Sequence, residues 1–465
     1  MATQESFEHI RAPAVAGFFY PEDPGELRAA VDAYLNGARQ THLEDPDTPW
    51  PKAVIAPHAG YVYSGPVAAS VYTRLEVARG TVNRGILLGP SHRVGFSGLA
   101  VPSAEAYVTP LGPIPIDARA IAEIAGFSQV RLMDEAHAQE HSLEVHLPFL
   151  QTILGDFNLV PIVVGDAAPE DVARVLDALW GGPETLVVIS SDLSHYHDYA
   201  KASSMDEATC RAIQMLQMDK VTTEGACGGR PIRGLMALAQ RRDLRITLVD
   251  LRNSGDTAGP RDKVVGYGSF IVEEGYRQRL SERFRRRLGD IAHRAIRSGL
   301  STGKEPSLST TLLPPRLSAP RASFVTLECE GRLRGCIGSL VPHQPLAVDV
   351  AQNAFRAAFK DPRFQPLTSE EYDNVDLSIS VLSIPVSIKF NSEDDLIAKL
   401  RPGIDGLILE DGKKRATFLP QVWKHYPEAP IFLQHLKTKA GFTPDYWADD
   451  LRVWRYTTES FDSAP

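Results

Sequence analysis

A short apolar run at Thr185–Ser190 most constrains what this chain can fold into, because it ends abruptly at Asp192 and His195. Its four consecutive apolar residues, three of them β-branched, are typical of a strand covered on both faces, as in a parallel sheet. The run therefore predicts a buried strand that delivers a carboxylate and an imidazole to one end of a sheet.

The same pattern occurs twice more. Ala53–Ala56 leads into a Pro/Gly turn that carries His58, and Gly85–Leu88 leads into one that carries His92. In open α/β sheets, ligands bind outside the carboxyl ends of the strands. We therefore expect the polar side chains after these three strands to converge on one site: His58, His92, Asp192 and His195.

Length and pattern predict two domains, because 465 residues exceed what one hydrophobic core usually serves. Residues 1–275 alternate apolar runs with amphipathic stretches, which predicts an α/β domain whose mostly parallel central sheet carries helices on both faces. The expected helices of this domain include Pro66–Leu75, Ala118–Ala125, Pro169–Leu179 and Ser204–Met215. We expect each domain to fold alone.

Residues 276–465 have an α+β pattern. Asp376–Ser383 alternates like a half-buried strand, and Asp411–Gly412 marks the tip of a hairpin. Six arginines crowd into residues 277–287, but Leu280, Phe284, Leu288 and Ile291 recur at helical spacing, which favours an amphipathic helix over a nucleic-acid site. Ser298–Arg321 is rich in Ser, Thr and Pro and is expected to be an exposed loop.

Composition argues against a membrane protein, a secreted protein and a nucleic-acid-binding protein. No apolar run approaches the roughly 20 residues that span a bilayer, and the first residues lack the basic and apolar regions of a signal peptide. Four cysteines in so long a chain do not make a disulfide framework, and the net charge of −9 gives no broad attraction for nucleic acid. We expect a cytoplasmic protein with no membrane or nucleic-acid partner.

Seven of the thirteen histidines fall between His58 and His197, a density that favours a metal site. Imidazole suits iron, copper, zinc or nickel, so His58 and His92 are the first candidate ligands. Cys227 is the candidate for the third, because flanking glycines allow close approach and Pro231 is placed to begin a helix. That helix, Arg230 or a metal would stabilise its thiolate; an ordinary buried thiol is the alternative. Cys210 is expected in the core.

Further polar residues surround these candidates. Glu140 and Glu144 are spaced to share a helix face with His141 alongside. They either line the pocket or fix imidazole tautomers, and the second role is favoured over direct ligation of the metal. Asp192 and His195 offer a carboxylate and a general acid or base, with a turn Asp and a surface His as the alternative. The expected pocket residues are Tyr61, Glu140, His141, Glu144, His146 and Arg230.

One segment of the second domain also carries a reactive residue type. Cys336 lies between two glycines and follows Arg334 and Gly335. A tight turn with a buried cysteine explains this segment equally well, and no base lies nearby in sequence.

With these motifs in view, residues 1–275 resemble the Memo family. The resemblance rests on Ala-Pro-His58-Ala-Gly-Tyr61, Gly-Pro-Ser-His92, Glu140-His-Ser-Leu-Glu-Val-His-Leu-Pro148, Ser-Ser-Asp192-Leu-Ser-His195 and Cys227-Gly-Gly-Arg-Pro-Ile232. Memo proteins are similar in fold to class III extradiol dioxygenases, which hold non-haem iron with two histidines and a glutamate. The resemblance implies metal binding by His58, His92 and Cys227, the cysteine replacing the glutamate, with Asp192 and His195 in the same cleft.

Residues 285–460 resemble the AMMECR family through Leu333-Arg-Gly-Cys-Ile-Gly338, Ala358-Phe-Lys-Asp-Pro-Arg-Phe364, Leu377-Ser-Ile-Ser-Val381 and Thr417-Phe-Leu-Pro420. The two families are known as partners of a radical-SAM protein in the AmmeMemoRadiSam set, and here they look fused. The resemblance implies that both domains serve one substrate or pathway with such a partner.

Three functions follow as hypotheses. The first is a metal-dependent, dioxygenase-like oxidoreductase with non-haem iron or copper acting on a small molecule, with His195 moving protons. The second is a binding module that uses the same cleft for a peptide or protein. The third is a zinc-dependent hydrolase, since an open zinc site also needs three protein ligands and a water.

Overall fold

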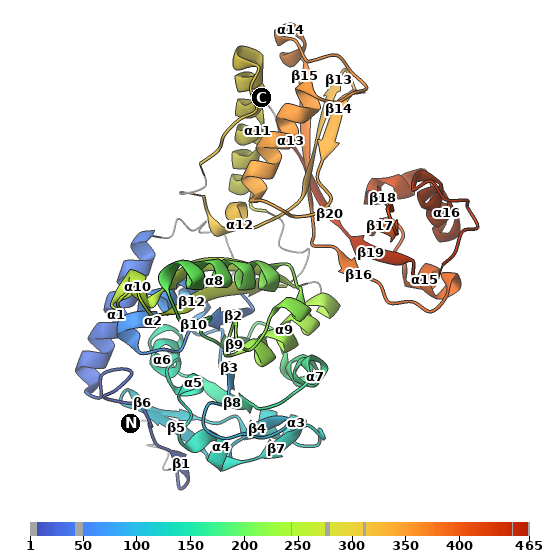
Figure 1. The fold of residues 1–465 in the computed structure, drawn as a ribbon. Helices are drawn as coiled ribbons and strands as arrows, with labels where there is room; N and C mark the ends of the chain where they lie inside the picture. The colour runs from blue at the N-terminus through green and yellow to red at the C-terminus, as the bar shows by residue number, and fades with distance from the viewer. Residues whose placement is uncertain are drawn as a thin grey trace. The chain divides into compact units, whose positions relative to one another are not determined.

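The computed structural model describes residues 7–41, 50–242, 244–274, 280–309, 313–448 and 450–463. The chain divides into two compact units, Met1–Gln278 and Arg279–Pro465 (Figure 1). The domain boundary predicted between residues 275 and 276 lies outside the described residues. Each unit has hydrophobic cores of its own, as a separately folding domain requires.

The N-terminal unit alternates strands and helices, which confirms the α/β class. Its strands are β1 (Ile10–Arg11), β2 (Ala53–Ala56), β3 (Arg84–Pro90), β4 (Leu99–Val101), β5 (Ala106–Thr109), β6 (Gly112–Pro115), β7 (Val130–Leu132), β8 (Asn158–Val164), β9 (Thr185–Ser190), β10 (His195–His197), β11 (Arg245–Asn253) and β12 (Val264–Glu273). Its helices are α1 (Pro24–Thr41), α2 (Tyr61–Tyr72), α3 (Ala118–Ile124), α4 (Asp134–Ala138), α5 (His141–Glu144), α6 (Leu147–Leu154), α7 (Pro169–Leu179), α8 (Tyr199–Gln214), α9 (Gly229–Arg242) and α10 (Ser254–Thr257), with 3-10 turns at Thr73–Ala78 and Met218–Lys220.

The central sheet has the strand order β10-β12-β2-β9-β3-β8-β4-β7, and β11 pairs with β12. The central strands β2, β9, β3 and β8 run parallel, whereas β12 is antiparallel to β2 and β11, and β4 is antiparallel to β8. The expectation of a mostly parallel sheet is therefore wrong at its margins. An apolar run does not encode strand direction. The segment Ser254–Lys263 between β11 and β12 is shorter than the dozen or so residues of a parallel crossover, so the chain returns antiparallel.

Helices pack on both faces of this sheet, and alternate residues of each central strand enter two different cores. In β9, Val187 and Ile189 contribute to the core shared with α7 and α9. Leu186 and Val188 contribute to the core shared with α1, α2 and α6. Cys210 is buried in the first core, as predicted. Burial on both faces explains why these strands are continuous apolar runs.

The C-terminal unit is α+β, with two four-stranded antiparallel sheets in the orders β14-β13-β15-β20 and β16-β19-β17-β18. Its elements are α11 (Glu282–Thr302), α12 (Pro315–Ser318), β13 (Ser323–Cys329), β14 (Arg332–Gly338), α13 (Leu346–Phe359), α14 (Ser369–Tyr372), β15 (Val375–Leu382), β16 (Val386–Ser387), α15 (Glu393–Lys399), β17 (Gly406–Asp411), β18 (Lys414–Phe418), a 3-10 turn at Pro420–Lys424, α16 (Ala429–Lys439), β19 (Arg452–Tyr456) and β20 (Thr458–Ser463). The predicted strand and hairpin are confirmed as β15 and β17–β18.

Helix α11 confirms the amphipathic prediction and corrects the predicted loop at Ser298–Arg321. Phe284 and Leu288 are buried on it, whereas Arg283 and Arg286 are exposed. The helix continues through Ser298 to Thr302 and ends at Gly303, whose φ is 66°. Gly299 lies inside the helix, where a Cβ would lie 2.2 Å from Phe359 Cε2. This glycine therefore permits close packing of α11 on α13, and α12 adds a further helical turn within the predicted loop.

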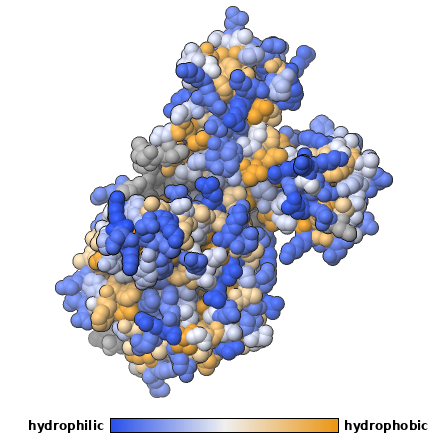
Figure 2. All heavy atoms as spheres, viewed as in Figure 1, coloured by the Kyte–Doolittle hydropathy of each residue, from blue (hydrophilic) through white to orange (hydrophobic). Residues whose placement is uncertain are grey.

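No helix in the described ranges is both long and apolar enough to cross a membrane. On the face shown in Figure 2, hydrophilic and hydrophobic residues are intermixed.

Candidate metal centre

The carboxyl ends of β2, β9 and β3 lie side by side and bring together residues that are far apart in sequence. His58 follows β2, Asp192 follows β9 and His92 follows β3. The His58 and His92 rings lie 5.1 Å apart between centroids, and Asp192 Oδ1 accepts a hydrogen bond from the His58 amide at 2.7 Å. Adjacent parallel strands thus place two imidazoles and a carboxylate at one edge of the sheet.

A third imidazole joins the two that follow the strands. The ligand atoms of His58, His92 and His141 all lie within 4.8 Å of one another. The His141 ring is 4.7 Å from that of His92 and 5.5 Å from that of His58. Within the described chain, the buried His141 Nδ1 makes no hydrogen bond, and Glu140 Oε1 lies 3.5 Å from it. His141, predicted to be a pocket residue, is therefore placed as a potential ligand.

Cys227 lies beside this group, on the His58 side. Its Sγ is 3.4 Å from His58 Nε2, and its amide donates to the Asp192 carbonyl at 3.2 Å. Burial and the nearby Asp192 carboxylate raise the pKa of the Cys227 thiol to about 12. Without a bound cation, this sulfur is therefore a neutral thiol.

The expected support of a Cys227 thiolate by Arg230 is not observed. Arg230 instead pairs with Asp166, with 3.1 Å between Arg230 Nη2 and Asp166 Oδ1. Helix α9 also begins at Gly229 and not at Pro231. The glycines before it permit close approach, because a Cβ on Gly228 would lie 2.4 Å from the Ser190 carbonyl oxygen.

Glu140 orients His92. Its Oε1 is 2.8 Å from His92 Nδ1, and its Oε2 accepts the His92 amide at 2.6 Å. Burial alone would raise the pKa of Glu140, but the hydrogen bonds and charge of His92 outweigh it and bring the pKa to about 2. An ionised carboxylate on Nδ1–H leaves the lone pair on Nε2, as in carboxylate–histidine–metal sites.

Glu140→Gln should lower the metal affinity of this site by about 10–100-fold, because the amide removes the charge that holds the His92 tautomer. Competition between the protein and a chelator for Co²⁺ would measure the change. Glu135→Gln, an exposed substitution on the neighbouring α4, is the matched control. Equal affinity in the two variants would contradict this role for Glu140.

Glu144 lies outside the pocket, contrary to expectation. Helix α5 spans only His141–Glu144, so Glu140 caps it and does not share a face with Glu144. The Glu144 carboxylate is fully buried and accepts hydrogen bonds from Arg11, Tyr20 and the amides of Ala14 and Val15. It anchors the N-terminal segment.

Tyr61 and His146 also lie in the core behind the three imidazoles. The Tyr61 hydroxyl donates to the Val145 carbonyl at 2.7 Å. His146 is 1% exposed, and burial lowers its pKa to about 3. Neither side chain lines the cavity beside the imidazole group.

Asp192 and His195 retain the features of proton-handling groups. Burial raises the pKa of Asp192 to about 7, although the amides of His58 and Ala59 oppose the shift. His195 Nδ1 donates to the Leu193 carbonyl at 2.8 Å, and burial lowers its pKa. His195 lies on β10, close enough for its charge to act on His58.

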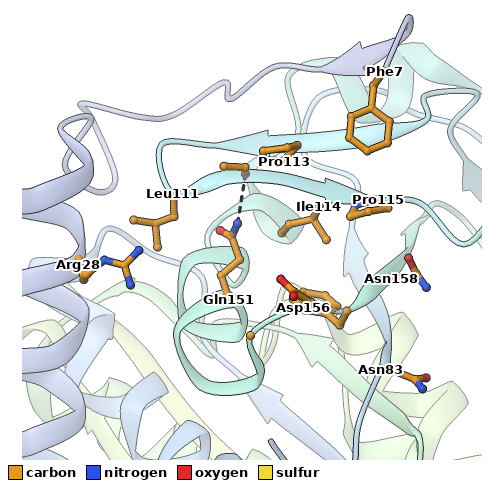
Figure 3. Close-up of a pocket in the computed structure, with 13 residues that line it drawn as sticks. Phe7, Arg28, Asn83, Leu111, Pro113, Ile114, Pro115, Gln151, Asp156 and Asn158 are labelled. Atoms are coloured by element: carbon orange, nitrogen blue, oxygen red, sulfur yellow. Dashed lines mark hydrogen bonds between the residues drawn. The ribbon is translucent and has the colours of Figure 1, made fainter. Parts of the chain in front are cut away.

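A cavity of about 350 Å³ opens beside the imidazole group, lined in part by His92, Val164, Asp166, Cys227 and Arg230. A larger cavity, of about 650 Å³, lies elsewhere in the unit. Figure 3 shows its lining, including Leu111, Ile114 and Gln151, whose amide donates to the Gly112 carbonyl. The smaller cavity is the one that adjoins candidate ligands, since His92 and Cys227 line it.

In the C-terminal unit, Arg334, Gly335 and Cys336 lie on strand β14, so the tight turn considered for them is wrong. Arg334 pairs with Glu371 at 2.9 Å. Cys336 is partly buried, its amide donates to Asp361, and its sulfur accepts from the Thr326 hydroxyl at 3.3 Å. The glycine is needed because a Cβ on Gly335 would lie 2.2 Å from the Ala357 carbonyl oxygen. These contacts favour a structural role in packing for Arg334, Gly335 and Cys336 over a catalytic one.

Comparison with known proteins covers both units. A family model described as Memo-like protein matches residues 11–271, and one described as AMMECR1 matches residues 289–461. A MEMO1 family protein of Aquifex aeolicus is 36% identical over 273 residues, covering 56% of this chain and 98% of the relative. One from Sulfolobus acidocaldarius is 34% identical over 279 residues, covering 56% and 97%. The crystal structure of an uncharacterized protein from Pyrococcus horikoshii matches with a TM-score of 0.35 and 36% identity, over 38% of this chain and 90% of that one.

Proposed function

This chain belongs to the Memo family through residues 11–271, joined to an AMMECR1 domain at residues 289–461, and from this premise we propose that it is a metal-dependent oxidoreductase. The metal would be held at the edge of the sheet by His58 and His92, with His141 and Cys227 as further donors. The resemblance to class III extradiol dioxygenases favours non-haem iron, and copper suits the same donors.

The observation that carries the proposal is the imidazole group itself. Three side chains offer ligand atoms within 4.8 Å of one another, and the buried Nδ1 of His141 has no hydrogen-bond partner among the described residues. The Glu140 Oε1 atom lies at the long distance of 3.5 Å from this nitrogen, so a cation would provide a stronger partner. Nitrogen and sulfur donors favour iron, copper or zinc over magnesium or calcium. The residues present therefore fit a transition metal.

When bound, such an ion would supply electron transfer to or from the substrate. The chain itself would handle the protons. His195 donates Nδ1–H to the Leu193 carbonyl, which leaves Nε2 to accept a proton from the substrate. The buried Asp192 carboxyl, fixed by the His58 amide, is a second group that could hold a proton.

The cavity beside the site favours a small molecule. Its volume of about 350 Å³ lies at the lower end of the usual range for ligand pockets. Arg230 lines it, and the exposed ion pair with Asp166 is weak, so the guanidinium is available to an acidic group of the substrate. We further propose that the AMMECR1 domain and a radical-SAM partner serve the same pathway, as the resemblance implies.

Anaerobic purification followed by metal analysis and electron spin resonance tests this function. We expect about one equivalent of iron or copper with a resonance signal that changes on reduction. The three imidazoles also match the ligand set of catalytic zinc, so a zinc-dependent hydrolase is the second candidate. Stoichiometric zinc would support that candidate. Protein that binds no transition metal would overturn both and favour a peptide- or protein-binding cleft.

A further inference from the structure

A single buried hydroxyl lies directly behind the imidazole group. Ser190, the last residue of β9, is fully buried and its Oγ contacts three partners. His58 Nδ1 lies 2.6 Å away, His146 Nε2 lies 2.8 Å away, and the Ser142 carbonyl oxygen lies 2.6 Å away. One oxygen atom thus joins the turn after β2, the start of α6 and helix α5.

The number of protons fixes the direction of every bond at this oxygen. A hydroxyl has one proton to donate and two lone pairs that accept. The Ser142 carbonyl can only accept, so the Ser190 proton points to it. Both imidazole nitrogens must therefore donate to Ser190. His58 then carries its proton on Nδ1, and His146 carries its proton on Nε2.

The hydrogen bond at the other ring nitrogen of His146 is consistent with a proton on its Nε2. Its Nδ1 lies 2.8 Å from the Tyr72 hydroxyl, which has a proton to donate to it. Burial raises the pKa of Tyr72 well above its usual value, so the phenol keeps that proton. The hydrogen bonds run from Tyr72 to His146, from His146 and His58 to Ser190, and from Ser190 to the backbone.

The other tautomer of His58 would break this network. With its proton on Nε2, His58 would need the Ser190 proton at Nδ1. The Ser190 and Ser142 oxygens would then face each other at 2.6 Å without a proton between them. Leaving a buried acceptor unsatisfied is unfavourable, so the network selects one tautomer.

We propose that Ser190 is a positioning residue that fixes His58 in the Nδ1–H tautomer and so turns the Nε2 lone pair toward the other candidate ligands. Nε2 is the atom that faces Cys227, at 3.4 Å from its sulfur. The inference rests on the proposed function, which makes His58 a ligand. The Glu140 carboxylate orients His92 in the same way. The neutral Ser190 hydroxyl thus orients His58, and a charged carboxylate orients His92.

The test uses the full chain with nitrogen-15-labelled histidine. Nitrogen chemical shifts of the metal-free protein report which ring nitrogen of His58 and His146 is protonated. Co²⁺ affinity, measured by competition with a chelator, reports the effect on the site. The variants are Ser190→Ala, Ser190→Thr, which keeps a hydroxyl, and Ser70→Ala as control. Ser70 is also buried, and its hydroxyl bonds to Asp250 instead.

We expect wild-type His58 to be protonated on Nδ1 and His146 on Nε2. Ser190→Ala should give a mixture of His58 tautomers and lower Co²⁺ affinity by about 10–100-fold, Ser190→Thr should restore both, and Ser70→Ala should change neither. Wild-type His58 protonated on Nε2 would overturn the inference even if Ser190→Ala failed to fold. A folded Ser190→Ala variant with unchanged tautomer and affinity would also overturn it. Failure of the wild type to bind metal would count against the proposed function alone, because the tautomers are read without metal.

Discussion

His58→Ala should lower the affinity of the N-terminal unit for iron, copper or Co²⁺ by well over about 100-fold and abolish turnover. Loss of a partner that only orients a ligand already costs about 10–100-fold, and loss of the ligand itself costs more. His58 Nε2 also lies 3.4 Å from the Cys227 sulfur, so its removal takes away a donor beside the thiol. His92→Ala should behave in the same way.

Metal affinity measurements on further variants can also show which of His141, Cys227 and His195 bind the metal. His141→Ala should weaken metal binding because it removes one of the three grouped imidazoles. Cys227→Ser should also weaken binding and should abolish the thiolate-to-metal absorption of the Co²⁺ or Cu²⁺ form. His195→Ala should retain most of the metal but lose turnover by about 10²–10⁴-fold, because a general acid or base does not hold the ion.

His197→Ala is the control for these variants, since it removes an imidazole from the same strand as His195. Metal content and dioxygen consumption with candidate catechols should be measured for all variants in parallel. Full metal occupancy in Cys227→Ser together with loss of metal in His195→Ala would show that the ligand assignment is wrong. His195 would then belong to the donor set.

The position of the candidate site was predictable from the sequence, because an apolar run followed by a turn marks the end of a strand. His58 and His92 each follow an apolar run and a turn, and parallel strands bring such turns to one edge. Helix α7 could be predicted to the residue, because Pro169 opens it and its apolar spacing is regular. In each of these cases the determining residues are close together in sequence.

Glu140 was predicted as a residue that could fix an imidazole tautomer, but the roles of Ser190 and Glu144 could not be predicted, because they depend on contacts between distant segments. Ser190 meets His58 across 132 residues of sequence and Ser142 across 48. His141 and Glu144 lie on one short helical turn, yet the first faces the imidazole group and the second faces Arg11. Sequence spacing placed both in one pocket because it assumed a longer helix than the four residues of α5.

The second large effect concerns Glu144 and the fold of the N-terminal unit. Glu144→Ala should lower the free energy of unfolding of this unit by about 3–5 kcal/mol, because it leaves the buried Arg11 guanidinium without its carboxylate. Arg11 also donates to the carbonyls of His137 and Glu140. Its displacement would therefore disturb the residue that orients His92, and we expect metal affinity to fall together with stability.

Hydrogen exchange of the β2 and β9 amides in the full chain would report the stability of this unit separately from that of the C-terminal unit. Glu76→Ala is the matched control. Glu76 is 36% exposed and pairs with Arg39 on the surface, where such a pair contributes at most about 1 kcal/mol.

Removing both Arg11 and Glu144 shows how much of the lost stability in Glu144→Ala comes from leaving the Arg11 charge unpaired. Arg11→Met combined with Glu144→Ala eliminates the buried charges, so the double variant should be destabilised by less than the sum of the two single variants. Additive losses would mean that Glu144 stabilises the unit through the amides of Ala14 and Val15 and the Tyr20 hydroxyl, independently of Arg11. A loss for Glu144→Ala no larger than that for Glu76→Ala would show that the N-terminal segment is not anchored by this carboxylate. In that case the disturbance of Glu140 through Arg11 would also be absent, and metal affinity should remain at the wild-type value.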